Sequence, residues 1–581
     1  MSEKNTRERT LPSLERPWLK YYREKVVDSE IVEETLYQRL IRSCSGAGRE
    51  EKIALTYFDR DRSFRWLIDE ADVAAAAFAA IGVKKGDIVA CCAVCSPEVV
   101  AAMFALNKLG AAIMLLDPRR SPEEFKSYAA DGRVRYFMVM DVFYPGFSKV
   151  LPELNAEKLI VLPMGRSAGI AAKLVLQYKC RKLEIPYDDT ILSYSGFLTL
   201  GIGTSVRTVG YDEFELAAVT FSGGTTGIPK GIMLSNRMMN AVADDLGGMN
   251  DEGIEFRSMG IVPIFTSYGL ACSIYGPLVL NARVILLPKP EPEKFGGMVK
   301  KYRPTNIVLV PGYFDAFMES REMQGVDMSF NISCASGGDS MSPALEERVN
   351  EFLRAHNAPY PHVAQGYGMS EMCSVETVCY GRAYKPGSVG IPMIHVNMCI
   401  CRPGTTEELG YGQVGEICAT GPSLFMGYLN HPEETDKVLI LHDDGKKWIH
   451  SGDMGYMDED GFLFFTGRIK RTIPRPDGHK VSPLQLESTV SAVENVAECA
   501  CVGVKDGVHT EGQMPVVAVK LHDASKETET MEHIRAALLR DVEERSMPMD
   551  VYTVNELPRI GMGKIDYEKI ATDYMQAHGI G

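Results

Sequence analysis

The stretch TFSGGTTGIPKG at residues 220–231 carries the residue types of a loop that binds phosphate. Its glycines let backbone amides turn toward an anion, its hydroxyls add hydrogen-bond donors, and its lysine adds positive charge. These residues are Ser222, Gly223, Gly224, Thr225, Thr226, Gly227 and Lys230. The composition favours a cradle for nucleotide phosphates over a glycine-rich surface turn.

A phosphate loop of the kinase type is excluded by the residue after the lysine. That loop requires G-x-x-x-x-G-K followed by serine or threonine, whose hydroxyl binds Mg2+. Here Gly231 follows Lys230, so this hydroxyl is missing. Any phosphate bound by this stretch is therefore held in another way.

Three further segments place charged or aromatic side chains among glycines. Each one alone could equally be a loop that carries a solvated charge. The segments are QGYGMSE (365–371) with Tyr367 and Glu371, WIHSGDMGYMDEDGFLFFTGRIK (448–470) with Asp453 and Arg468, and LPRIGMGKID (557–566) with Lys564.

Elements that could position these segments follow from the alternation of apolar runs and helical patterns. Strands are predicted at 87–94, 281–288, 305–311 and 331–338, and a helix at 96–110 that begins at Ser96-Pro97 and ends at Gly110. This alternation is typical of parallel α/β layers. Ligands bind beyond the carboxyl ends of such strands, where TFSGG and CASGG stand.

The last 110 residues or so have a different pattern. Strands are predicted at 494–504 and 514–523, followed by a helix whose apolar face is formed by Met531, Ile534, Leu538 and Val542. The basic run 467–480 precedes this unit and is interpreted as a linker. The chain is therefore expected to be an α/β protein, with a large N-terminal domain of layered sheets and a small α+β C-terminal domain.

Composition limits the class of protein further. A net charge of −15 over 581 residues argues against general binding to nucleic acid. No secretory signal or membrane-spanning run is evident, and Cys92 and Cys95 are interpreted as buried core thiols, with a redox or zinc pair as the minor alternative. A cytoplasmic location is expected. The basic, partly apolar helix predicted at 165–182 leaves peripheral contact with a membrane open.

In this order and spacing, the four motifs closely resemble the adenylate-forming superfamily, which includes acyl- and aryl-CoA ligases, firefly luciferase and the adenylation domains of peptide synthetases. The resemblance runs from about residue 34 to Lys564. It implies a large domain at 1–469, a mobile small domain at 470–581 and a hinge at Lys470. The form SGGTTG is similar to that of medium- and long-chain fatty acyl-CoA ligases.

The resemblance also implies residues that bind ATP. The glycine-rich loop would hold the β- and γ-phosphates, Tyr367 would stack on adenine, and Asp453 would accept the ribose hydroxyls. Glu371, with Thr225 or Thr226, would hold Mg2+, and Lys564 would be the catalytic lysine. The remaining nucleotide contacts would come from Gly338, Asp339, Gly368, Met369, Ser370, Phe465 and Arg468.

The acid and the acceptor are implied less closely. Phe265, Tyr313, Ser336, Gly337 and Gly366 would line an acyl pocket, and Thr266 stands where many CoA ligases have histidine. The small residues favour a medium- or long-chain fatty acid over an aryl acid. Gly478 and His479 would border the CoA channel. Two further readings stay open, namely a separate carrier protein as acceptor and an ATP-binding regulator without ligase activity.

Overall fold

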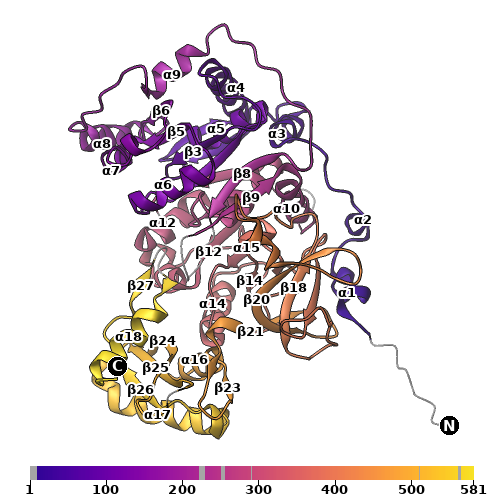
Figure 1. The fold of residues 1–581 in the computed structure, drawn as a ribbon, viewed down its shortest axis with the longest axis vertical. Coiled ribbons are helices and arrows are strands. Elements are labelled where there is room, and N and C mark those ends of the chain that lie inside the picture. Colours follow the sequence, from indigo (N-terminus) through magenta and orange to yellow (C-terminus); the bar gives the residue numbers. More distant parts are fainter. Residues whose placement is uncertain are drawn as a thin grey trace, which may run out of the picture.

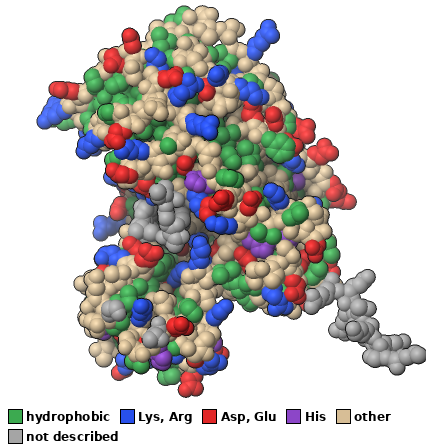
Figure 2. Space-filling view, viewed as in Figure 1, with side chains coloured by type: hydrophobic (Ala, Val, Ile, Leu, Met, Phe, Trp, Pro, Cys, Tyr) green, Lys and Arg blue, Asp and Glu red, His purple; other side chains and the backbone are tan. Residues whose placement is uncertain are grey.

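The computed structural model describes residues 10–221, 229–249, 255–289, 291–509, 511–560 and 564–580, with backbone only at 560 and 564. The described chain forms a large part and a small C-terminal lobe (Figure 1). A hollow separates the lobe from the large part, and Lys and Arg side chains lie along it (Figure 2). This arrangement confirms the predicted α/β fold with a small α+β C-terminal unit.

The first sheet of the large part positions the ends of the glycine-rich loop. It has the strand order β7-β6-β5-β3-β4-β8-β9, and only its last pair is antiparallel. The strands are β3 (Ile88–Cys92), β4 (Ala112–Leu116), β5 (Tyr136–Met140), β6 (Lys158–Leu162), β7 (Ile191–Ser193), β8 (Leu216–Phe221) and β9 (Gly231–Ser235). The predicted phosphate loop joins β8 to β9.

Helix α5 (Pro97–Leu109) begins and ends at residues whose types alone predict a helix boundary. The Ser96 hydroxyl accepts a hydrogen bond from the Val99 backbone N–H, and proline occupies the first turn. Gly110 ends the helix in the left-handed region, with φ at 73°. Both ends therefore agree with the prediction. The other long helices of the large part are α3 (Leu36–Cys44), α4 (Phe64–Ala80), α6 (Pro122–Asp131), α8 (Ile170–Cys180), α10 (Asn236–Met249), α12 (Pro292–Tyr302) and α14 (Pro343–Ala355).

The second sheet has the order β16-β15-β14-β13-β12-β10-β11-β1-β2. Its strands are β1 (Ile53–Tyr57), β2 (Arg60–Ser63), β10 (Arg257–Gly260), β11 (Arg283–Leu286), β12 (Asn306–Leu309), β13 (Ser333–Ser336), β14 (Val363–Tyr367), β15 (Thr377–Val378) and β16 (Ile391–Pro392). Strands β12, β13 and β14 are parallel, so their carboxyl ends meet at one edge. CASGG and QGYGMSE both leave the sheet at this edge.

A third sheet, antiparallel throughout, was not predicted from the sequence. It consists of β17 (Asn397–Cys401), β18 (Gly415–Thr420), β19 (Leu439–Leu441), β20 (Lys447–Met457) and β21 (Leu463–Arg468). The pairing of β20 with β21 places Asp453 directly opposite Arg468. Asp453 and Arg468, both distant in sequence from the glycine-rich loop, are thereby neighbours in one sheet.

The C-terminal lobe has its own apolar cores around the sheet β24-β25-β26. Its elements include β24 (Val496–Val504), β25 (Met514–Leu521), β26 (Asp550–Thr553), α16 (Pro483–Ser491), α17 (Glu527–Asp541) and α18 (Tyr567–Ala577). Two hairpins complete it, β22 (Ile473–Pro474) with β23 (Lys480–Val481), and β27 (Arg559–Ile560) with β28 (Lys564–Ile565).

Helix α8 (Ile170–Cys180) lies within the basic stretch that left membrane contact open. Its apolar side chains are unusually exposed, with Ile170 at 82% and Tyr178 at 63% of their full area. No helix in the described part of the chain combines the length and apolar character needed to cross a membrane. Peripheral membrane contact by α8 stays a prediction.

Candidate active site

Tyr367 and Asp453 meet where β14 and β20 approach each other. The Tyr367 hydroxyl donates a 3.0 Å hydrogen bond to Asp453 Oδ2, and Arg468 Nε lies 3.2 Å from Oδ1. The ring of Phe465 stacks beside Tyr367, with 6.1 Å between centroids. Burial raises the pKa of Asp453, while the charge of Arg468 and the hydrogen bond from Tyr367 oppose that shift. Four predicted nucleotide residues therefore form one cluster.

Glu371 lies beside this cluster, in the short helical turn η7 (Ser370–Met372). Its Oε1 accepts a 2.7 Å hydrogen bond from the Tyr428 hydroxyl. Burial raises the pKa of Glu371, and Tyr428, Lys230 and Arg468 all act in the opposite direction. Glu371 is thus a partly exposed side chain whose carboxyl has a raised pKa, and the nearby cations limit that shift.

Lys230 joins the same network from the residue just before β9. Its ammonium lies 2.5 Å from Glu434 Oε2 and 5.1 Å from the centroid of the Tyr428 ring. Tyr428 and Glu434 were not predicted from the sequence. The signal was present in GYLNHPEET (427–435), where an aromatic and two carboxylates follow a glycine. The predicted loop residues ahead of Lys230, namely Ser222, Gly223, Gly224, Thr225, Thr226 and Gly227, lie outside the described residues.

The turn after β14 requires small residues. A Cβ on Gly368 would stand 1.9 Å from the Ser374 carbonyl oxygen, and one on Gly366 would stand 3.0 Å from the Thr377 carbonyl oxygen. Only glycine allows the first approach. Met369 and Ser370 follow, partly exposed, so the whole QGYGMSE segment lies against the cluster's edge of the sheet.

A second buried carboxyl, Glu376, lies behind the turn and was not predicted. Neither of its side-chain oxygens has a hydrogen-bond partner among the described residues, and the side chain is fully buried. Burial, followed by the charges of Asp453 and Glu371, raises its pKa well above the ordinary value. The folded environment therefore favours the protonated form of Glu376.

The predicted acyl-pocket residues fall in two places along the second sheet. Ser336 ends β13 with its hydroxyl buried and without a described partner, and a Cβ on Gly337 would reach 3.4 Å from the Tyr268 ring. Gly338 and Asp339 are exposed just beyond, and Tyr313 ends the turn after β12. These residues share the edge at which β14 also ends.

Phe265 and Thr266 lie before the π-helical segment Gly269–Tyr275. The Thr266 hydroxyl donates to the Pro263 carbonyl at 2.8 Å and accepts from the Gly269 N–H at 3.0 Å. Thr266 therefore supports the turn itself. The Arg119 guanidinium lies 5.5 Å above the buried Phe265 ring, a contact that was not predicted either.

The C-terminal lobe presents the β27–β28 hairpin on the side that faces the large part (Figure 1). Lys564 begins β28, although its side chain lies outside the described residues. Burial, followed by the charge of Glu487, raises the pKa of Tyr567, three positions on, and the charge of Asp339 adds to that shift. The lysine hairpin is thereby near the carboxyl end of β13.

Lys470 lies between two anchors. Arg468 pairs with Asp453 in the large part, whereas Arg471 pairs with Glu487 at 2.6 Å and lies 3.7 Å from the Tyr567 ring centroid in the lobe. Gly478 and His479 form the turn between β22 and β23, where His479 Nε2 contacts Ser546 at 2.9 Å and Glu543 at 3.0 Å. No described contact joins this turn to the Asp453 cluster.

Comparison with known proteins gives the family. The profile of the AMP-binding enzymes matches residues 44–429, and that of the AMP-binding enzyme C-terminal domain matches 485–564. A 4-coumarate–CoA ligase of Humulus lupulus is 28% identical over 542 residues, which cover 92% of this chain and 91% of the relative. A long-chain-fatty-acid–CoA ligase of Bacillus subtilis is 26% identical over 575 residues, with 97% and 99% covered.

Solved structures agree on the fold. An anthranilate CoA ligase in complex with anthranoyl-AMP has a TM-score of 0.80 at 21% identity and covers 95% of this chain and 99% of its own. ATP-bound MatB from Rhodopseudomonas palustris has a TM-score of 0.77 at 22% identity, with 94% and 100% covered. Both matched profiles, in the expected order along the chain, place this protein in the AMP-binding enzyme family, to which it belongs.

Proposed function

We propose that this protein is an AMP-forming ligase that joins a carboxylic acid to CoA. The acid and ATP would first give an acyl adenylate and pyrophosphate, and the thiol of CoA would then displace AMP. The supporting observation is the convergence of Tyr367, Asp453 and Glu371 at the edge where β14 and β20 meet. At this edge an aromatic ring (Tyr367) lies near one carboxylate suited to bind ribose (Asp453) and a second suited to bind a metal ion (Glu371).

The roles follow from the side-chain chemistry. Asp453, fixed on both oxygens, would accept the ribose hydroxyls, and the stacked rings of Tyr367 and Phe465 offer a face for adenine. Hard oxygen donors suit Mg2+, and the Glu371 carboxyl with the hydroxyl of Thr225 or Thr226 would supply such donors. A bound Mg2+ would neutralise charge on the phosphates.

The first step develops negative charge on the α-phosphate and on the departing pyrophosphate, so positive charge and positioning dominate its catalysis. Lys230 and the glycine-rich loop would hold the β- and γ-phosphates. Lys564, on a hairpin near the end of β13, would act at the reacting centre. In this acidic protein, such local cations are needed to receive ATP.

The second step would use a different orientation of the lobe. The division we propose, 1–469 and 470–581, follows from the two anchors on either side of Lys470. Rotation about Lys470 would withdraw Lys564, because Tyr567 ties its hairpin to Arg471. Gly478 and His479 would then border the CoA channel.

A medium- or long-chain fatty acid is the proposed substrate, on the basis of the SGGTTG form and the small residues Ser336, Gly337 and Gly366. An aryl acid is the second candidate. The observation that favours it is the buried Ser336 hydroxyl without a described partner, which a polar ring substituent could satisfy.

The deciding experiment is CoA-dependent AMP release over a panel of fatty and aryl acids, with acid-dependent pyrophosphate exchange measured in parallel. Lys564→Ala is the matched variant and should lose exchange by about a hundredfold or more while it still binds ATP. If none of the acids in the panel supports pyrophosphate exchange, the protein is an ATP-binding regulator. Exchange without CoA-dependent release would point to a carrier protein as acceptor.

A further inference from the structure

Three buried thiols and two imidazoles gather in the third sheet, outside the residues assigned to catalysis. Cys399 and Cys401 project from the same face of β17, and Cys418 stands opposite Cys399 on β18. All three are at most 1% exposed, and with Trp448 they form an apolar cluster separate from the main core. His442 and His450 complete the group from β19's end and β20. We refer to these five residues as the thiol–imidazole cluster.

The sulfurs are spaced for a shared ligand. Cys399 Sγ and Cys401 Sγ are 3.5 Å apart, whereas a disulfide bond is about 2.05 Å long. In a tetrahedral site with Zn–S bonds of about 2.3 Å, neighbouring sulfurs lie about 3.8 Å apart. Cys418 faces Cys399 across the β17–β18 pair and packs in the same apolar cluster, and its Sγ also lies within 4.8 Å of ligand atoms of Glu416 and His450. The spacing of Cys399 and Cys401 is therefore near that of two thiolates on one ion, and Cys418 is the thiol next to them that could join as a third.

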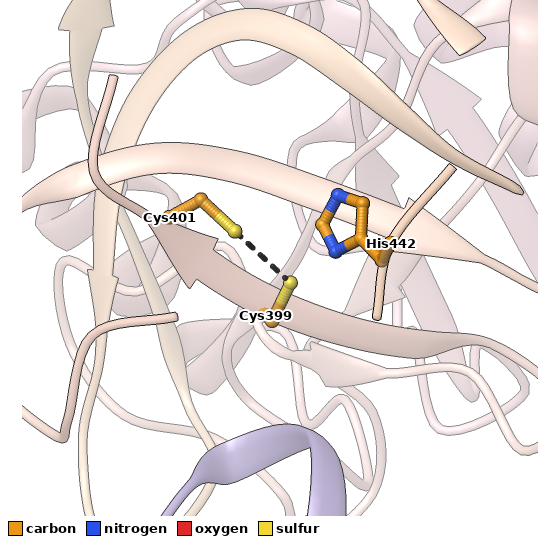
Figure 3. A group of neighbouring side chains, drawn as sticks. All are labelled: Cys399, Cys401 and His442. Atoms are coloured by element: carbon orange, nitrogen blue, oxygen red, sulfur yellow. Dashed lines mark hydrogen bonds between the residues drawn. The ribbon is translucent and has the colours of Figure 1, made fainter. Parts of the chain in front are cut away.

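His442 supplies a fourth donor. One of its ring nitrogens lies within 4.8 Å of both Cys399 Sγ and Cys401 Sγ, and Figure 3 shows the nitrogen-bearing edge of the ring turned toward the two sulfurs. Trp448 stacks on the ring at 5.2 Å and 19°, which fixes its plane. His442 is only partly buried, and the hairpin residues after it are exposed, so an ion has a path from solvent.

A relay of hydrogen bonds orients the imidazoles. Glu416 Oε2 lies 3.1 Å from His450 Nδ1, so that nitrogen donates, and the unprotonated His450 Nε2 accepts from His442 Nε2 at 2.9 Å. Nδ1 of His442 is then unprotonated, and its lone pair can bind a metal ion held by the sulfurs. A carboxylate that fixes a histidine in this way is a common support for a metal ligand.

We propose that the three sulfurs of the thiol–imidazole cluster and Nδ1 of His442 bind one Zn2+ ion in a closed structural site. Thiolate and imidazole ligands in tetrahedral array select zinc among common divalent ions. Each thiol releases its proton to solvent as it becomes a ligand, so no oxidant or reductant is required. The site is independent of the proposed ligase reaction.

The first test is the metal content of the full-length, tag-free protein purified under reducing conditions. We expect about one equivalent of zinc per chain by plasma mass spectrometry. His442→Ala and Cys401→Ser should each lose at least four-fifths of it, and Cys44→Ser, a buried thiol elsewhere in the large part, should keep it. Full zinc in both cluster variants would overturn the assignment.

A second measurement does not depend on a variant folding. Wild-type protein stripped of metal by chelator under reducing conditions should bind Co2+ and develop the strong visible bands of tetrahedral cobalt, together with a sulfur-to-cobalt charge-transfer band, and Zn2+ should abolish both. Octahedral Co2+ spectra, or no binding, would refute the site. A Cys399–Cys418 disulfide in the freshly purified protein, detected as a linked peptide, would also refute it.

Discussion

Tyr367 donates a 3.0 Å hydrogen bond to Asp453, and this bond joins the second sheet to the third. Tyr367 ends β14, and Asp453 lies within β20, so the two residues belong to layers that fold from chain segments 86 residues apart. Arg468 holds the other carboxylate oxygen. A carboxylate fixed on both sides presents its remaining lone pairs in one direction, as recognition of a ribose diol demands.

Removal of the Tyr367 hydroxyl should weaken ATP binding more than it slows chemistry. Tyr367→Phe keeps the ring but leaves Asp453 fixed on one side only, and a hydrogen bond to a charged group is worth about 1.5–3 kcal/mol. We expect the KM for ATP in pyrophosphate exchange to rise about tenfold, with kcat changed less than about threefold. Tyr456→Phe is the control: Tyr456 lies in β20 with Asp453, but its ring stacks on Phe464, and the variant should change neither constant. An unchanged KM in Tyr367→Phe would remove Asp453 from the proposed ribose site.

The segment between Arg468 and Arg471 should govern the second step. Lys470→Pro fixes φ at about −65° and so restricts rotation between the two anchors. We expect the overall acyl-CoA rate to fall at least about tenfold, while adenylate formation stays within about threefold of wild type. Single-turnover assays of each step would measure the two rates. Lys470→Ala should retain both, and an equal loss of both steps in the proline variant would place the hinge elsewhere.

Much of the α/β frame could be predicted because its signals are local. Ser96, Pro97 and Gly110 bound α5 within 15 residues, and buried strands such as β3 are short apolar runs. The third sheet escaped prediction because β19, β20 and β21 are only partly buried and mix polar with apolar residues, so they lack that uniform apolar character.

Contacts between distant segments were equally hidden. Lys230 and Glu434 are 204 residues apart, and Glu371 and Tyr428 are 57 apart, so no periodicity connects them. The same holds for the thiol–imidazole cluster, since Cys399 and Cys418 meet only through the register of β17 with β18. By contrast, Cys92 and Cys95, which the sequence places at a recognised spacing, are buried thiols that belong to neither described group of potential metal ligands.

Glu376 should cost stability at neutral pH. Burial, with the charges of Asp453 and Glu371, raises its pKa well above 4.5, so the folded state holds a proton that the unfolded chain releases. The free energy of unfolding therefore falls as pH rises above 4.5. Glu376→Gln is neutral in both states, and its stability relative to wild type should rise between pH 5 and pH 8 by about 1–3 kcal/mol, which is about 1–3 °C in Tm for a chain of this length. Urea unfolding at both pH values would test this, and a constant difference between the two proteins would mean that the carboxyl is charged in the fold.

His395 should make the opposite kind of contribution, favourable in acid and lost in base. Its Nδ1 contacts the buried Asp245 at 2.6 Å and its Nε2 contacts the Ser29 carbonyl oxygen at 2.8 Å, so each nitrogen faces an oxygen acceptor, an arrangement that favours the charged ring. Burial by itself lowers the pKa of His395, but Asp245 outweighs it and the pKa is raised above 6.5. Because the folded pKa exceeds the unfolded one, the added stability is fully present below pH 6.5 and disappears as pH rises through the folded value.

The variant His395→Gln isolates this contribution, because glutamine can still donate one hydrogen bond but carries no charge. Its loss of stability relative to wild type should be about 2 kcal/mol near pH 6 and should shrink steadily toward pH 9, as measured by urea unfolding. The exposed His533→Gln is the matched control and should follow the wild-type profile at every pH. A loss that stays the same across the range would show that His395 is held as a neutral ring, and the link it makes between the Ser29 segment and α10 would then rest on hydrogen bonding alone.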